Sequence, residues 1–144
     1  MSELHNIVPS HLASASKSQK LIFFETLLCL SAADGVQDDD EIKFISDNAK
    51  INGIDIEELE NHCDPDTILQ DVQKIKNRAL ALELIREMCF LAHVDNELSD
   101  EEVLLIGRVG QAMGISMRKI EQISSWVVDH IVWLEQAKII FEED

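Results

Sequence analysis

The sequence predicts an all-α fold of seven to eight helices, arranged as a duplicated helical unit with pseudo-twofold symmetry. Apolar residues recur at intervals of three to four through most of the chain, and no segment alternates convincingly as a strand would. When the sequence is shifted by 61 positions, it matches itself without a gap for about forty residues. The shift superimposes several pairs of residues: Asp34 and Asp95, Glu41 and Glu102, Gly53 and Gly114, Glu60 and Glu121.

The chain length indicates a single domain. Its 144 residues are enough for one real core and too few for two comfortable ones. We expect a flexible N-terminal segment at 1–17 and one helical domain at 18–144. Within that domain the first half covers about 18–63, the second half about 78–125, and a C-terminal helix about 126–142.

The first half is expected to contain a helix, a tight turn, a second helix, and shorter helices after it. Residues 18–33 are apolar on almost every side, which is typical of a central helix buried all round. The next helix begins at the acids around Asp38 and ends at Gly53, a residue that supplies a left-handed C-cap. Asp55 then starts a short helix, and Asp64-Pro65 is a further start signal.

The second half repeats this order. The segment 78–94 is again strongly apolar, and the following helix begins after Ser99 and ends at Gly114. Ser116 starts the next helix. From Ile120 to Phe141 the apolar residues form one stripe, which fits either one bent helix or two. Trp126 and Trp133 share a face of this segment; they are core or helix-docking residues, or they line a groove for a partner.

Composition narrows the classes of function. The chain has 28 acidic and 12 basic residues, a net charge of −16, which disfavours binding to nucleic acids and to anionic membranes. No apolar run approaches the ~18 residues that a membrane helix needs. The N-terminus lacks the apolar stretch of a signal peptide. We interpret the three cysteines, Cys29, Cys63 and Cys89, as reduced residues of a cytoplasmic protein.

The repeated acidic turns have two interpretations. Asp38 to Glu41 and Ser99 to Glu102 both fit a capping box, in which the first side chain accepts from the N–H three residues on and the glutamate reaches back. Asp34 and Asp95 differ, because each follows a long apolar helix whose last carbonyls already make the site negative. Solvent, N–H groups, a basic side chain or a cation must offset that repulsion. The spacing is not that of an EF-hand.

A family resemblance rests on these turns. Ala-Ala-Asp-Gly-Val at 32–36, followed by acids that end at Glu41 and by an apolar helix, resembles the TerB-like domain family, named for bacterial tellurite-resistance proteins. The similarity covers about 18–125 and includes the second copy, which departs from the motif at Val94 and at Asn96-Glu97. The resemblance implies a compact helical domain and acidic clusters proposed to bind metal. They are carried here by Asp34 and Glu41, and by Asp95 and Glu102.

We therefore expect a non-enzymatic acidic domain that binds a divalent cation such as Ca²⁺ or Mg²⁺, or serves as an interaction module in a bacterial stress response. The alternative is a metal-independent adaptor whose acids dock a basic protein partner. No nucleophile or metalloenzyme motif is present, and Glu25, Glu83 and Glu87 fit exposed edges or ion pairs with Arg86 or lysines. The possible accessory ligands are Asp38, Asp39, Asp100 and His93.

Overall fold

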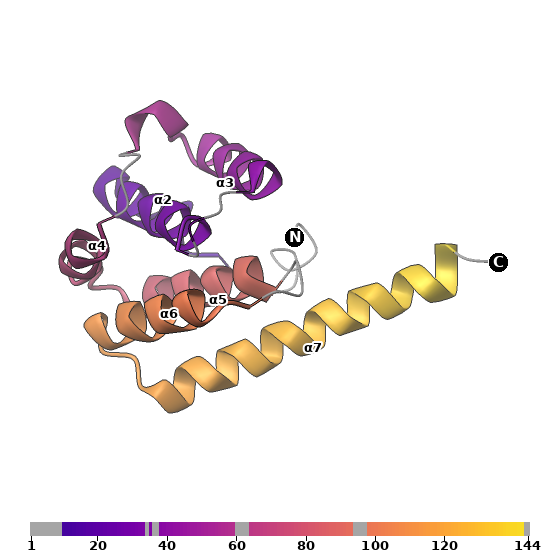
Figure 1. The fold of residues 1–144 in the computed structure, drawn as a ribbon. Coiled ribbons are helices and arrows are strands. Elements are labelled where there is room, and N and C mark those ends of the chain that lie inside the picture. Colours follow the sequence, from indigo (N-terminus) through magenta and orange to yellow (C-terminus); the bar gives the residue numbers. More distant parts are fainter. Residues whose placement is uncertain (1–9, 34, 36–37, 60–63, 94–97, 143–144) are drawn as a thin grey trace.

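A computed structural model describes residues 10–33, 35, 38–59, 64–93 and 98–142. Every regular element in these ranges is helical, which confirms the all-α class (Figure 1). The described part holds six α-helices and one 3-10 helix, so the count of seven to eight helices is not confirmed. The elements are α2 (Lys17–Ser31), α3 (Asp39–Ile51), η1 (Ile56–Glu58), α4 (Pro65–Val72), α5 (Arg78–His93), α6 (Asp100–Ala112) and α7 (Met117–Glu142).

Helix α5 is the centre of the packing. It contacts α2 on one side and α6 and α7 on others, while α2 also packs against α3 and α4 (Figure 1). Helix α4 packs against α6, so the first and second halves of the chain are also in contact through this pair of helices. Helix α7 runs along the body and then continues beyond it, so its C-terminal end projects away from the other helices (Figure 1). No described helix is both long and apolar enough to cross a membrane.

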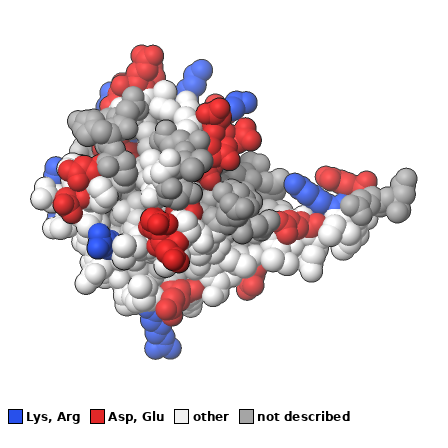
Figure 2. Space-filling model, in the orientation of Figure 1, with Lys and Arg blue, Asp and Glu red and all other residues white. Residues whose placement is uncertain are grey.

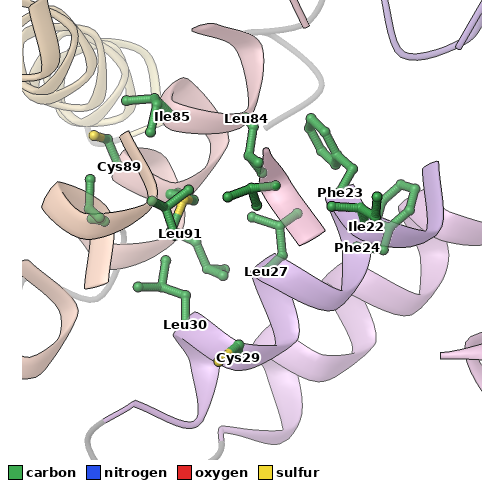
Figure 3. Close-up of a cluster of buried hydrophobic side chains, with 14 of the residues drawn as sticks. Ile22, Phe23, Phe24, Leu27, Cys29, Leu30, Leu84, Ile85, Cys89 and Leu91 are labelled. Atoms are coloured by element: carbon green, nitrogen blue, oxygen red, sulfur yellow. The ribbon is translucent and has the colours of Figure 1, made fainter. Parts of the chain in front are cut away.

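The core lies between α2 and α5, as their apolar composition predicts. Phe23, Leu27 and Leu30 of α2 are buried, and Leu84 and Ile85 of α5 are completely buried. Figure 3 shows Phe23, Leu27, Leu30 and Leu84 between the two helices, while Ile85 lies on the face of α5 toward α6. Because each large apolar side chain gains about 1.5–3 kcal/mol when it is fully buried, this contact supplies much of the stability of the domain.

Two glycines end helices as the sequence predicts. Gly53 and Gly114 have φ values of 80° and 78°, in the left-handed region that glycine tolerates best. After each glycine, an isoleucine N–H donates to the helix at 2.8 Å: Ile54 to the carbonyl of Ala49, and Ile115 to that of Gly110. Both isoleucines are buried. These are Schellman caps, which satisfy carbonyls that a helix end leaves unpaired.

The equivalent helices agree in length but not in all their packing. Helices α3 and α6 both have 13 residues and start 61 positions apart. Helices α2 and α5 also start 61 positions apart and have 15 and 16 residues. However, α4 packs against α6, whereas no comparable packing of α7 against α3 occurs among the described residues. The duplicated unit with pseudo-twofold symmetry is therefore not confirmed.

The C-terminal segment forms one helix. Helix α7 has 26 residues and runs through position 126, where the sequence suggested that a separate C-terminal helix begins. In the first half, η1 and α4 are separate elements, and Pro65 stands in the first turn of α4. The sequence has neither Gly nor Pro after Gly114, so no residue interrupts the helical hydrogen bonds of α7.

The cysteines differ from the prediction. Cys29 is disulfide-bonded, so the interpretation of three reduced cysteines is wrong for this residue. Cys89 is a free, buried thiol, and Cys63 lies outside the described residues. A cytoplasmic location stays a prediction, and a disulfide at Cys29 is unusual for a reducing compartment.

Candidate functional site

The structure describes only part of the predicted acidic site. Asp34 and Asp95 lie outside the described residues, so the geometry of these two predicted ligands stays a prediction. Glu41 and Glu102 are both described, together with the accessory residues. Their surroundings show which carboxylates are already bonded within the protein.

At the first acidic turn, Glu41 reaches back to the preceding helix. Its carboxylate is half-buried and accepts a hydrogen bond of 3.1 Å from the hydroxyl of Ser31, the last residue of α2. Asp38 caps α3 by accepting from the N–H of Asp40 at 2.8 Å, two residues on and not three as the capping box requires. The prediction of a cap is confirmed here, but its partner is different. Asp39 is exposed.

At the second acidic turn, the predicted capping box is present. The N–H of Glu102 donates to the hydroxyl of Ser99, and the N–H of Ser99 donates back to the Glu102 carboxylate, both at 3.1 Å. Glu102 is buried, whereas Asp100 in the same turn is exposed. The buried carboxylate is thus held by the start of its own helix, where the positive end of the helix dipole also favours it.

His93 has a partner on another helix. Its Nε2 lies 3.0 Å from the hydroxyl of Ser124 on α7, within hydrogen-bond distance. The same hydroxyl hydrogen-bonds to Cys89. Burial raises the pKa of the Cys89 thiol to about 11, and the bond from Ser124 offsets part of that rise. A thiol with a raised pKa is a poor nucleophile at neutral pH, so this trio connects α5 to α7 and does not activate the sulfur.

Among the residues that the structure describes, no group of three or more His, Cys, Asp or Glu side chains could hold a metal ion. The prediction of a cation site therefore depends on Asp34 and Asp95. The exposed acids nearby remain accessible: Asp38, Asp39 and Asp40 at the start of α3, and Asp100 and Glu101 at the start of α6. We call these five residues the acidic turns. Carboxylates are spread over much of the face in Figure 2, where lysines and arginines are fewer.

A cluster of buried charged side chains lies on α5, separate from the acidic turns. Glu83, Arg86 and Glu87 are each at most 6% exposed. The Arg86 guanidinium lies 3.2 Å from the Glu87 carboxylate and 3.8 Å from that of Glu83. The ion pairs with Arg86 were predicted, but the expectation of exposed edges is wrong for these glutamates.

Residues distant in the sequence complete this cluster. The hydroxyl of Ser10 and the N–H of His11 both donate to the Glu83 carboxylate at 2.7 Å. The segment just before α2 is thereby fastened to α5. No pattern in the sequence indicates this contact, because it joins residues more than 70 positions apart.

Beside the cluster, a groove of about 470 Å³ lies between α5 and α7. Leu82 of α5 and Ile123 and Trp126 of α7 form apolar walls, and the charged lining residues are Lys119 and the ion-paired Glu83 and Arg86. The sequence offered a groove at the tryptophans as one alternative, but not its position between α5 and α7. The indication of a groove in the sequence was the pair Trp126 and Trp133. In the structure these residues are 41% and 60% exposed. The interpretation of these tryptophans as core residues is therefore wrong.

Both tryptophans stack on one histidine. The ring of His130 lies 5.8 Å from that of Trp126 and 5.9 Å from that of Trp133, centroid to centroid. The three rings form a continuous aromatic strip along α7, with the groove at one end. Comparison of the chain with protein-family models, curated proteins and solved structures gives no match.

Proposed function

We propose that the chain is a non-enzymatic interaction module of the TerB-like type that acts in a bacterial stress response. In this proposal the acidic turns dock a basic protein partner without a metal. The supporting observation is the division of the carboxylates: Glu41 and Glu102 are bonded inside the protein, whereas the acidic turns are exposed. Between positions 34 and 71 the only basic residues are Lys43 and Lys50, so little internal charge compensates these acids.

Attraction between opposite charges mainly raises the rate at which two partners associate and the selectivity between partners. A surface with one sign of charge accelerates binding of an oppositely charged partner and repels like-charged ones. The attraction is screened over about 8 Å at physiological ionic strength, so binding should weaken as salt is added.

The test uses a lysine-rich peptide as the probe and fluorescence anisotropy as the readout. The triple variant Asp38→Asn, Asp39→Asn, Asp40→Asn should weaken binding at least tenfold, and asparagine keeps the N-cap at position 38. The matched control is Asp129→Asn, Glu135→Gln, Glu142→Gln on α7, which removes the same charge elsewhere. Equal losses in both variants would show that net charge alone binds the peptide. Binding that requires added metal would also contradict the proposal.

A divalent-cation site is the second candidate. It is supported by Glu41, whose carboxylate accepts a hydrogen bond from Ser31 at the end of α2. Ser31 precedes Asp34 by three positions in the sequence. Hard cations prefer such carboxylate and carbonyl oxygens. Calorimetric titration with Ca²⁺, Mg²⁺, Mn²⁺ and Zn²⁺ should then give binding that the double variant Asp34→Asn, Asp95→Asn abolishes. The control is Asp55→Asn with Asp64→Asn, and equal binding by all three proteins would exclude the site.

The duplication belongs to the same proposal. It is supported by the equal lengths of α3 and α6 and by the two Schellman caps at Gly53 and Gly114. The different packing of α4 and α7 opposes a complete twofold relation. In our proposal the two copies of the unit diverged after their second helix. In the first copy a separate helix, α4, begins at Pro65, whereas in the second copy the corresponding segment is part of the long helix α7.

A further inference from the structure

Helix α7 carries large apolar side chains that its own domain does not cover. Trp126 and Trp133 are accompanied by Ile140 and Phe141, which are 66% and 83% exposed. Trp126 lines the groove beside α5, whereas Ile140 and Phe141 stand at the C-terminal end of α7, the end that projects beyond the body (Figure 1). A contiguous exposed apolar surface of this kind marks a contact with another molecule.

Exposed and half-buried side chains on one face of α7 follow the spacing of a coiled coil. Intervals of three and four residues alternate without a break along one face, which we call the α7 seam: Ile123, Trp126, His130, Trp133, Ala137 and Ile140. Such 3-4 spacing keeps a face of one helix against a second helix. The buried stripe that anchors α7 to its own domain is a different one, formed by Ile120, Val127 and Ile131.

The seam is complementary to itself. Its intervals are the same when read from either end, so an antiparallel copy matches it in one register. That register places Ile123 opposite Ile140, Trp126 opposite Ala137, and His130 opposite Trp133. The large indole of Trp126 thus meets the smallest side chain of the seam, and the imidazole of His130 meets a second indole.

The charges permit this pairing. The positions that flank the seam on either side carry no charge except at Asp129. In the antiparallel register, the flanking residue of the second copy nearest to Asp129 is Gln136. No acid therefore faces an acid across the contact, although each chain carries a net charge of −16. Because α7 projects from one end of the body, an antiparallel arrangement also keeps the two acidic bodies at opposite ends (Figure 1).

We propose that α7 pairs antiparallel with α7 of a second copy of this chain, and that each Ile140 enters the groove between α5 and α7 of the other copy. The groove is at the correct end, because Ile123 both lines it and stands opposite Ile140 in the register. The contact is isologous and closes on itself, so it stops at a dimer.

The small size of the contact indicates a weak association. The exposed parts of Trp126, Trp133, Ile140 and Phe141 amount to on the order of 500 Å² per copy, below the ~800 Å² per partner of a standard stable interface. We therefore expect a dissociation constant of about 10 μM, with monomer at submicromolar concentration.

Sedimentation equilibrium tests the association. The weight-average mass should rise from close to the monomer mass of 16.3 kDa at about 0.5 μM to about 30 kDa at about 200 μM. The double variant Trp133→Gln, Ile140→Gln should stay monomeric with unchanged helicity, because both side chains are exposed. The matched control is Ile51→Gln, an 82% exposed isoleucine on α3, which should dimerise like the parent. A monomeric parent at 200 μM, or a double variant that still dimerises, overturns the proposal.

Disulfide trapping tests the direction of pairing. A mixture of the variants Ile123→Cys and Ile140→Cys should form a crosslinked heterodimer under mild oxidation. Each variant alone should not, because the two identical positions are about 25 Å apart along antiparallel helices. Crosslinking of each variant with itself would show parallel pairing and would overturn the register. Among the cysteines that the structure describes, the free thiol of Cys89 is buried and should not interfere.

Discussion

The buried Arg86 is a polar residue whose removal should cost a large part of the stability of the domain. Its side chain is 7% exposed, and those of Glu83 and Glu87 are 4% exposed. The variant Arg86→Met keeps the length and apolar stem of the side chain but leaves two buried carboxylates without their cation. Breaking a buried ion pair from one side costs about 3–5 kcal/mol, against a total stability of about 5–15 kcal/mol.

The buried guanidinium also has a cost of its own, which reduces the expected loss. Its Nε is buried and has no hydrogen-bond partner, so the parent already carries a penalty that methionine removes. We therefore expect the free energy of unfolding to fall by about 3 kcal/mol, at the lower end of the range. For a chain of 144 residues this corresponds to a drop in Tm of about 10 °C.

Urea unfolding followed by circular dichroism measures this change. Arg78→Met is the matched control, since Arg78 begins the same helix and is exposed, and its effect should stay within about 0.5 kcal/mol. Adding Glu83→Gln to Arg86→Met should recover part of the loss, because glutamine carries no charge, its oxygen still accepts from the His11 N–H, and its NH2 group can donate to the Ser10 hydroxyl oxygen. If Arg86→Met and Arg78→Met differ by less than about 1 kcal/mol, the cluster does not depend on charge compensation.

Three further changes test the helix ends and the buried thiol. Ser99→Ala should lower the free energy of unfolding by about 1 kcal/mol in urea, whereas Asp100→Ala, which only complements the helix dipole, should cost a few tenths. Gly114→Ala should destabilise by about 1 kcal/mol because its φ is positive, whereas Gly107→Ala inside α6 should stabilise by about 0.5 kcal/mol. Because the pKa of Cys89 rises on folding, from 9.0 to about 11, its contribution to stability is complete below pH 9. That contribution, about 2–3 kcal/mol, should be lost as the pH rises to 11, and Cys89→Ala should remove this dependence.

Each of these comparisons has an outcome that contradicts its reasoning. Equal losses for Ser99→Ala and Asp100→Ala would mean that the capping box contributes nothing beyond charge. A stabilising Gly114→Ala would show that the backbone at that position relaxes freely. If Cys89→Ala loses stability between pH 9 and 11 as the parent does, other groups cause the effect.

The parts of the fold that the sequence predicts are those fixed by local chemistry. Gly53 and Gly114 end their helices because few other residues accept a positive φ, and Ser99 starts α6 because its hydroxyl reaches an N–H three residues away. The burial of α2 and α5 follows from apolar residues on all their sides. Each of these signals lies within one helical turn or one helix, so it can be read without knowing the packing.

Contacts between distant segments could not be predicted in this way. Glu41 was expected to close a capping box with Asp38, but the packing of α2 against α3 presents the Ser31 hydroxyl to it. Glu83 was expected either at an exposed edge or in an ion pair; it is paired with Arg86, and Ser10 and His11, which no pattern indicated, also bond to it. In both cases the carboxylate had two chemically suitable surroundings, and only the tertiary arrangement selects one.

Salt distinguishes the two contacts that we propose, because their physical origins differ. Docking of a basic partner on the acidic turns depends on charge, so its affinity should fall steadily between about 50 and 500 mM salt. Pairing through the α7 seam buries a face that is almost uncharged, and the bodies that approach each other both carry −16. Screening reduces that repulsion, so the dimer should be unaffected or slightly tighter at high salt. A dimer that dissociates with salt in parallel with peptide release would be held by charge, and the α7 seam would then not be its interface.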